Sequence, residues 1–162
     1  MTADSMEETA RLVTETWRAA TPDDAAIDAV GVAFFKRIFE IAPGALEMFS
    51  FKDEPAEGLY ASEKFLTHAR KVIRTVGVAV DGLGDLDALV PVLKGLGARH
   101  VGYGVAAAHY DVVGQALVDT LAVGLGDAFT DEVRAAWVAV YGVVSSTMQA
   151  GAEAFVKKNL KE

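Results

Sequence analysis

Apolar residues recur every three or four positions along most of this chain, and this helical period constrains the fold more than any other feature. The stretch between Asp24 and Pro43 is typical, and one face of it carries Ile27, Val30, Phe34, Phe35, Ile38 and Ile41. No segment shows the sustained two-residue alternation of a β-strand. The sequence therefore predicts an all-α domain with about seven to eight helices.

Composition limits the domain organisation and the chemistry. The chain has 162 residues, of which 52% are hydrophobic, so one core can bury roughly two thirds of the unfolded surface. No repeat or linker divides it, and we expect residues 1–162 to form a single domain. The absence of cysteine excludes disulfides, zinc–thiolate sites and iron–sulfur clusters. The net charge of −8 argues against a nucleic-acid partner, which would require a cationic surface.

The N-terminal residues predict neither a secretory signal nor a membrane anchor. Residues 1–13 are acidic and lack a cationic start followed by an apolar run,. The longest unbroken apolar run, residues 135–144, is much shorter than the roughly 18 residues that suggest a membrane span. We therefore expect a cytoplasmic protein without a membrane partner.

Several helix ends are marked by capping residues. Ser5 and Glu8 form a capping-box pattern at the start of a helix that we expect to end near Ala20,. Residues 21–24, Thr-Pro-Asp-Asp, supply a threonine cap, a proline for the first turn and acids favoured by the helix dipole,. Residues 50–60 mix charge with proline and glycine and predict a loop. Further helices are expected over residues 61–80, 89–100, 108–124 and 131–158.

Two histidines lie within these apolar faces, His68 in residues 61–80 and His100 in residues 89–100. A buried imidazole without a partner costs on the order of a few kcal/mol. For either histidine alone, a core imidazole bonded to a nearby carbonyl is the simpler interpretation. Because the two lie on different helices, however, they could hold a metal macrocycle between them.

The helix that carries His100 has the weaker local signal. Pro91, Gly95 and Gly97 all oppose helix formation, each glycine by up to about 1 kcal/mol relative to alanine. Something outside the local sequence must therefore hold this segment, and an iron–nitrogen bond at His100 would stabilise it.

Other motifs give little support to other chemistries. Residues 102–107 fit a relaxed dinucleotide-binding pattern, but no predicted strand precedes them,. His109 and Asp111 could supply two ligands of a small metal site, without a third at ligand spacing on the same segment,. The serines lack a nucleophile-elbow pattern, and the carboxylates fall on polar faces or helix caps. The histidine pair remains the strongest candidate.

Four segments resemble the globins: EIAPGALEMFSF, the tripeptide Thr67-His68-Ala69, LGARHVGYGV and AHYDVVGQAL. They are most similar to the plant non-symbiotic haemoglobins, and the last is also similar to bacterial haemoglobins and to the globin part of flavohaemoglobins. The resemblance covers about residues 10–155. Phe35 to Phe49 is 14 residues, Phe49 to His68 is 19, and His68 to His100 is 32, all ordinary for globins. A globin fold enclosing a haem pocket is therefore expected.

The resemblance also implies roles for particular residues. His100 is similar to the proximal ligand of haem b (iron protoporphyrin IX), and Phe49 to the phenylalanine that wedges against the porphyrin. His68 resembles the distal histidine, which either steadies bound dioxygen as the catalytic residue or ligates the iron itself. Further cofactor contacts are expected from Phe35, Val72, Leu96, Val105, Tyr110 and Val113, with ordinary core packing as the alternative. Lys71 and Arg99 would reach the haem propionates unless they are simply solvated charges.

By resemblance, the chain binds dioxygen and other diatomic gases such as nitric oxide and carbon monoxide reversibly. Flavohaemoglobins carry Tyr and Gln where this chain has Phe35 and His68, which favours the plant-like pattern with a distal histidine that commonly ligates iron. Conversion of nitric oxide to nitrate, or a nitrite reductase side activity, would need an external reductase, since no flavin or nicotinamide module is expected. A haem-based gas or redox sensor that acts through a protein partner and a haem-free structural globin remain alternatives. The protein could be a monomer or a homodimer.

Overall fold

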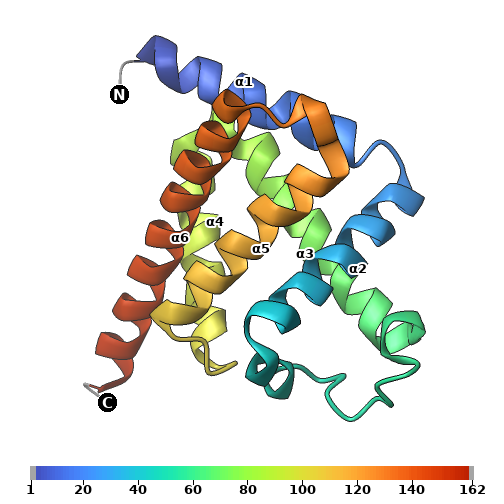
Figure 1. Cartoon of the computed structure of the whole chain (residues 1–162). Coiled ribbons are helices and arrows are strands. Elements are labelled where there is room, and N and C mark those ends of the chain that lie inside the picture. Colours follow the sequence, from blue (N-terminus) through green and yellow to red (C-terminus); the bar gives the residue numbers. More distant parts are fainter. Residues whose placement is uncertain (1–2, 161–162) are drawn as a thin grey trace.

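The structure is a computed structural model, and it describes residues 3–160 (Figure 1). Its α-helices are α1 (Ala3–Ala20), α2 (Asp24–Ile41), α3 (Glu63–Asp81), α4 (Leu86–Val101), α5 (Ala107–Leu125) and α6 (Asp131–Leu160). The six-residue 3-10 helix η1 (Pro43–Met48) makes a seventh helix. Three-residue 3-10 turns follow at η2 (Leu59–Ala61), η3 (Gly82–Gly84) and η4 (Gly126–Ala128). No strand occurs in this part of the chain, which confirms the all-α prediction.

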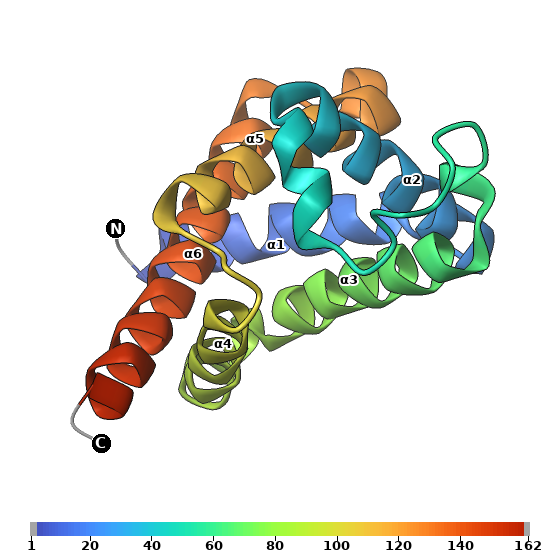
Figure 2. The ribbon, with the colours of Figure 1, turned by 90° about the horizontal axis from the view of Figure 1, so that it is seen from below.

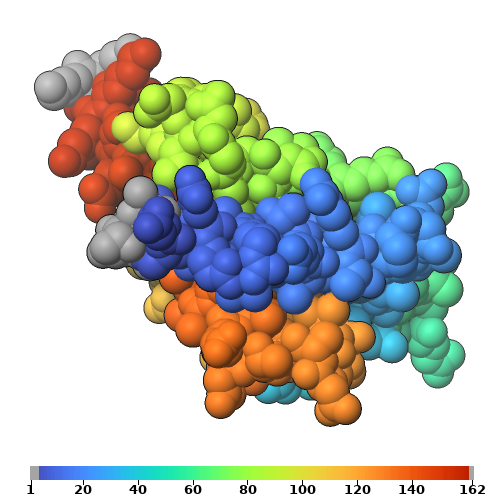
Figure 3. All heavy atoms as spheres, turned by 90° about the horizontal axis from the view of Figure 1, so that it is seen from above, coloured from blue at the N-terminus to red at the C-terminus, as the bar shows by residue number. Residues whose placement is uncertain are grey.

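The helices pack directly on one another in two groups. α2 contacts both α3 and α5, while α4 packs along α6 at the other end of the molecule (Figure 2). α1 runs across one face, with the end of α3 on one side and the end of α5 and the start of α6 on the other (Figure 3). Within residues 3–160, none of the helices combines the length and the hydrophobicity that a membrane span requires.

Two hydrophobic clusters follow this division. The larger joins α1, α2, α3, α5 and α6, and its largest fully buried side chains are Phe34, Phe35, Phe51, Phe65 and Trp137. The smaller joins α4, α5 and α6 through Leu89, Leu93, Tyr110 and Met148. Aromatic rings thus concentrate beside α3, and aliphatic side chains concentrate beside α4.

The start of α2 differs in detail from the prediction. Asp23, rather than Thr21, is the N-cap, and its carboxylate accepts a hydrogen bond from the Ala26 amide at 2.8 Å. The Thr21 hydroxyl instead donates to the Trp17 carbonyl at 2.7 Å and so completes the end of α1. An aspartate caps a helix as well as a threonine does, so the pattern alone does not distinguish the two.

The predicted capping box at the start of α1 is wrong. The helix already begins at Ala3, which places Ser5 inside the first turn. Glu8 pairs with Arg11 on the exposed face of the helix. An exposed glutamate in a helix can form this ion pair with any arginine three residues later.

α3 begins and packs as its sequence indicates. The Ser62 hydroxyl caps it by accepting from the Phe65 amide at 3.1 Å. Arg70 then reaches α2 and donates two hydrogen bonds to the Asp28 carboxylate, each 2.8 Å long. Local capping and a side-chain ion pair therefore both hold this helix.

α4 is held by close contact with α6. A Cβ atom added at Gly97 would lie only 1.8 Å from the carbonyl oxygen of Met148, and one added at Gly151 would lie 2.2 Å from that of Lys94. Neither space can hold a side chain, so the two backbones approach each other only because both residues are glycine. This contact is the external support that the weak helical signal of α4 requires.

Candidate functional site

His100 lies in the last turn of α4 with its imidazole half-buried. Its Nδ1 is 2.7 Å from the carbonyl oxygen of Leu96, one turn earlier. A carbonyl only accepts hydrogen bonds, so Nδ1 carries the proton and donates it. In the neutral imidazole, Nε2 then keeps its lone pair, and this nitrogen has no hydrogen-bond partner among residues 3–160,. A neutral imidazole fixed in this tautomer can bind a metal through Nε2.

His68 projects from α3 into a group of phenylalanine rings. Its ring centroid is 5.6 Å from that of Phe35, 5.3 Å from that of Phe49 and 5.5 Å from that of Phe51. Its imidazole makes no hydrogen bond within the described part of the chain. The ring nitrogens of His68 are therefore available to a ligand, as Nε2 of His100 is.

The electrostatic surroundings keep His68 uncharged. Burial lowers the pKa of His68 below its usual value, and the positive charge of Lys71 lowers it further,. The neutral imidazole is consequently favoured at neutral pH.

Phe49 and Phe35 differ in how much of each ring is covered. Phe35 is only 2% exposed and sits within the aromatic group. Phe49 follows η1 and is half-buried; it stacks on Phe51 at 5.1 Å and meets the edge of Phe35 at 5.5 Å. Phe49 therefore keeps apolar surface available to a flat ligand, while Phe35 supports the rings beside His68.

The other predicted cofactor contacts come from both hydrophobic clusters. Val72 and Val113 pack on the larger cluster, and Leu96 and Val105 pack on the smaller one. All four are half-buried, so each retains some apolar surface. Whether these surfaces contact a cofactor stays a prediction.

Tyr110 is the most deeply buried polar residue near α4. It is 7% exposed and belongs to the smaller cluster. Its hydroxyl is buried without a hydrogen-bond partner, although its backbone carbonyl accepts a hydrogen bond from the Tyr141 hydroxyl. A buried hydroxyl without a hydrogen-bond partner is energetically costly. The Tyr110 hydroxyl therefore marks a place in the smaller cluster where a hydrogen-bonding group is missing.

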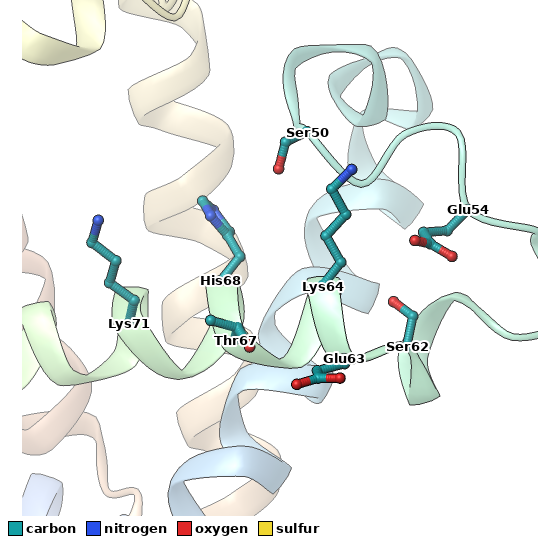
Figure 4. A pocket seen from close by; sticks show the side chains of 8 residues that line it. All are labelled: Ser50, Glu54, Ser62, Glu63, Lys64, Thr67, His68 and Lys71. Atoms are coloured by element: carbon teal, nitrogen blue, oxygen red, sulfur yellow. The ribbon is translucent and has the colours of Figure 1, made fainter.

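An open cavity of about 660 Å³ lies over the exposed side of α3 (Figure 4). It is lined by Ser50, Glu54, Ser62, Glu63, Lys64, Thr67, His68 and Lys71. Lys64, His68 and Lys71 extend from the same side of the helix in the close-up view. The cavity therefore leads from solvent to His68, while His100 is not part of its lining.

The predicted cationic residues lie at the surface. Lys71 borders the cavity that reaches His68, and Arg99 is exposed on α4. Neither makes an ion pair with another described residue. The expectation that they reach propionates stays a prediction.

Sequence reasoning missed two features of this site. Lys64 borders the cavity, and its position four residues before His68 could have placed it on the same helical face. The ring of Tyr103 lies 5.4 Å from that of His100. No periodic signal predicts that contact, because Tyr103 follows the end of α4.

Comparison with known proteins agrees with the fold. The family model described as Globin matches residues 32–148. Neuroglobin-2 of Oncorhynchus mykiss is 35% identical over 123 residues, which cover 75% of this chain and 77% of that protein. Neuroglobin of Danio rerio is 36% identical over 123 residues, with the same coverage. The narrower similarity to plant and bacterial haemoglobins stays a prediction.

Solved structures share the same arrangement of helices. A Drosophila melanogaster hexa-coordinate haemoglobin superposes with a TM-score of 0.80 at 23% identity, covering 91% of this chain and 93% of the other. A hexacoordinated haem protein from an anhydrobiotic tardigrade gives a TM-score of 0.82 at 20% identity, with coverage of 94% and 96%. At these identities the likeness establishes the fold. Together with the family match and the neuroglobin relatives, it shows that this chain belongs to the globin family.

Proposed function

We propose that this globin holds one haem b between α3 and α4 and binds dioxygen and other diatomic gases reversibly. The observation that carries the proposal is the state of His100, whose Nδ1 is bonded to the Leu96 carbonyl while Nε2 has no partner. Metal-binding histidines almost always have this arrangement, because the hydrogen bond at the second ring nitrogen fixes the tautomer and raises the basicity of the first. His100 would thus be the proximal ligand.

The surrounding residues suit a haem. The donor set is one imidazole on each of two helices, α3 and α4, and half-buried apolar side chains pack on the hydrophobic cluster beside each helix. The buried Tyr110 hydroxyl, which has no hydrogen-bond partner, further supports a pocket that holds a group other than the protein's own atoms. When bound, haem supplies an iron centre that coordinates diatomic gases. The chain supplies the axial nitrogen, the apolar wall that excludes water, and the distal imidazole.

We further propose that His68 is the second protein ligand in the resting state. Its neutral imidazole, without a hydrogen bond of its own, supports this role, and two structural neighbours are described as hexacoordinate. External gases would then compete with His68, and the apparent affinity would be reduced by the fraction of molecules in the open state. In that open state His68 would donate a hydrogen bond to the gas, as in the plant-like pattern.

Conversion of nitric oxide to nitrate is the reactivity that best suits this arrangement, with nitrite reduction as a side activity. The open cavity beside His68 supports it, because a second small molecule can approach from solvent. Nitric oxide, dioxygen and one electron balance one nitrate ion, so an external reductase must supply the electron. We place this activity in the cytoplasm, and the protein could act as a monomer or a homodimer.

A gas or redox sensor remains the second candidate. The same histidines would serve it, and ligand exchange at His68 would be transmitted through α3. Partner binding that changes with the gas present would favour this role over reversible gas binding alone. A haem-free globin is disfavoured by the unbonded Nε2 of His100.

The proposal is tested by titrating the purified full chain with haemin and recording absorption spectra. We expect a Soret band that saturates at one haem per chain, and a chain that never develops this band would exclude the function. Reduction without oxygen then tests His68. Sharply split visible bands mean that His68 ligates the iron, whereas one broad band means an open sixth position.

A further inference from the structure

The chain folds tightly around His100 as it leaves α4. The carbonyl of His100 accepts hydrogen bonds from the amides of Tyr103 at 3.0 Å and Val105 at 3.3 Å. Between them, Gly104 has a φ of +78°, a left-handed conformation that favours glycine. The backbone of this turn therefore places the side chain of residue 103 directly beside the histidine.

The Tyr103 ring uses that position to contact the imidazole. The two ring centroids are 5.4 Å apart with an interplanar angle of 68°, an edge-on arrangement. Aromatic pairs favour this geometry at such separations. Tyr103 is nevertheless 59% exposed, so core packing does not explain its position. The contact with His100 is its one aromatic contact among the described residues.

The hydrogen bond to Leu96 leaves the imidazole of His100 one rotational degree of freedom. It holds Nδ1 at 2.7 Å from the carbonyl, but the ring can still pivot about that bond, and the pivot changes the direction in which Nε2 points. A neighbouring ring against the flank of the imidazole opposes this motion. Within residues 3–160, Tyr103 is the one aromatic residue placed there.

We propose that Tyr103 is a positioning residue that sets the ring plane of His100 and thereby the direction of its Nε2 lone pair. The inference rests on the proposed function, because it assumes that Nε2 binds the haem iron. Tyr103 acts through His100 and contacts it with the edge-on ring pair alone. The aromatic ring, rather than the phenolic hydroxyl, carries the effect.

Three variants of the full chain test this proposal. Tyr103→Leu removes the ring, Tyr103→Phe keeps the ring without its hydroxyl, and Phe155→Leu removes an aromatic ring that is 40% exposed on α6. Phe155 has no ring contact with His100, so its variant controls for the loss of an exposed aromatic residue.

The first readout needs no haem. The chain has three histidines, so NMR can assign the ring signals of His100. We expect Tyr103→Leu to shift the His100 signals through the lost ring current, and Tyr103→Phe to leave them near the wild-type values. A nuclear Overhauser effect between the Tyr103 and His100 rings should appear in the wild-type chain, and its absence would overturn the proposal even if the leucine variant does not fold.

The second readout uses the haem-loaded protein. We expect Tyr103→Leu to lose haem to an acceptor globin about two- to tenfold faster, the range expected for one aromatic pair. We also expect it to shift the iron–imidazole stretching band of the ferrous protein in a His68→Leu background, where His100 would be the one protein ligand. Tyr103→Phe should restore both properties. If Tyr103→Leu matches Phe155→Leu, or if Tyr103→Phe behaves like Tyr103→Leu, the proposal is wrong while the proposed function stands. A wild-type chain that holds no haem would refute the proposed function, and the NMR readout would still test the contact between Tyr103 and His100.

Discussion

The two helices that carry the histidines are held in different ways. α3 begins at a serine cap and is tied to α2 by the ion pair between Arg70 and Asp28. α4 carries Pro91 within it, and its close contact with α6 depends on Gly97 and Gly151. Side-chain interactions thus position α3, which carries His68, whereas backbone contact positions α4, which carries His100.

The difference explains why glycines occur in a helix that must hold a ligand. Glycine weakens a helix by about 1 kcal/mol relative to alanine, but here it lets α4 and α6 approach more closely than any side chain would allow. A rigid backbone contact then supports the turn that carries His100. We expect changes at this contact to have the largest effects on stability, and changes in the side chains of α3 to have smaller ones.

The largest effect is expected from Gly97→Ala. The added Cβ would overlap the Met148 carbonyl, so the two helices must separate at a cost of about 3 kcal/mol or more. Gly95→Ala is a matched control on the same helix, because its Cβ would meet only an Arg99 side-chain nitrogen at 3.9 Å. We expect the control to be neutral or stabilised by up to about 1 kcal/mol. Urea unfolding measures both, and equal losses in the two variants would contradict this account of α4.

A smaller effect is expected when the cap of α3 is removed. Ser62→Ala leaves the Phe65 amide without its side-chain acceptor and should lower the free energy of unfolding by about 1 kcal/mol. Ser62→Asp keeps an acceptor and should retain most of the stability. If the alanine variant is as stable as the wild type, the Ser62 cap does not stabilise α3.

The smallest effect concerns the response of α3 to acid. The hydrogen bond from Arg70 lowers the pKa of Asp28 in the folded chain, and nearby positive charge lowers it further. The stability contributed by this carboxylate is therefore present above its unfolded pKa and is lost as the pH falls through its folded pKa. Asp28→Asn cannot titrate, so its unfolding free energy should fall less steeply than that of the wild type as the pH is lowered below about 4. Parallel stability curves would show that the ion pair does not matter.

Several features were predictable because they follow from local periodicity. The helical stripes predicted the all-α fold, and they placed His68 and His100 on different helices, where both imidazoles are half-buried. The family resemblance added the expectation of a globin fold, which the comparisons confirm. Local pattern is sufficient here because each helix buries one face against its neighbours.

Other features depend on contacts between distant segments. The sequence shows that Gly97 weakens α4, but not that the carbonyl of Met148 occupies the space beside it. Likewise, the cavity beside His68 joins α3 to residues of the preceding loop, and no period relates the two. The contact between Tyr103 and His100 depends on a turn whose geometry the apolar pattern does not encode.

The central claim is that His100 anchors a haem, and haem retention after substitution of each histidine tests it most directly. We expect His100→Ala to abolish stable haem binding, since the unbonded Nε2 of that ring is the proposed proximal ligand. His68→Leu, on the opposite wall, should keep the haem and release oxygen faster. Both chains should be titrated with haemin beside the wild type and passed through a desalting column. Loss of the Soret band in the His100 variant alone is the predicted result, and a His100→Ala chain that retains haem like the wild type would contradict the account.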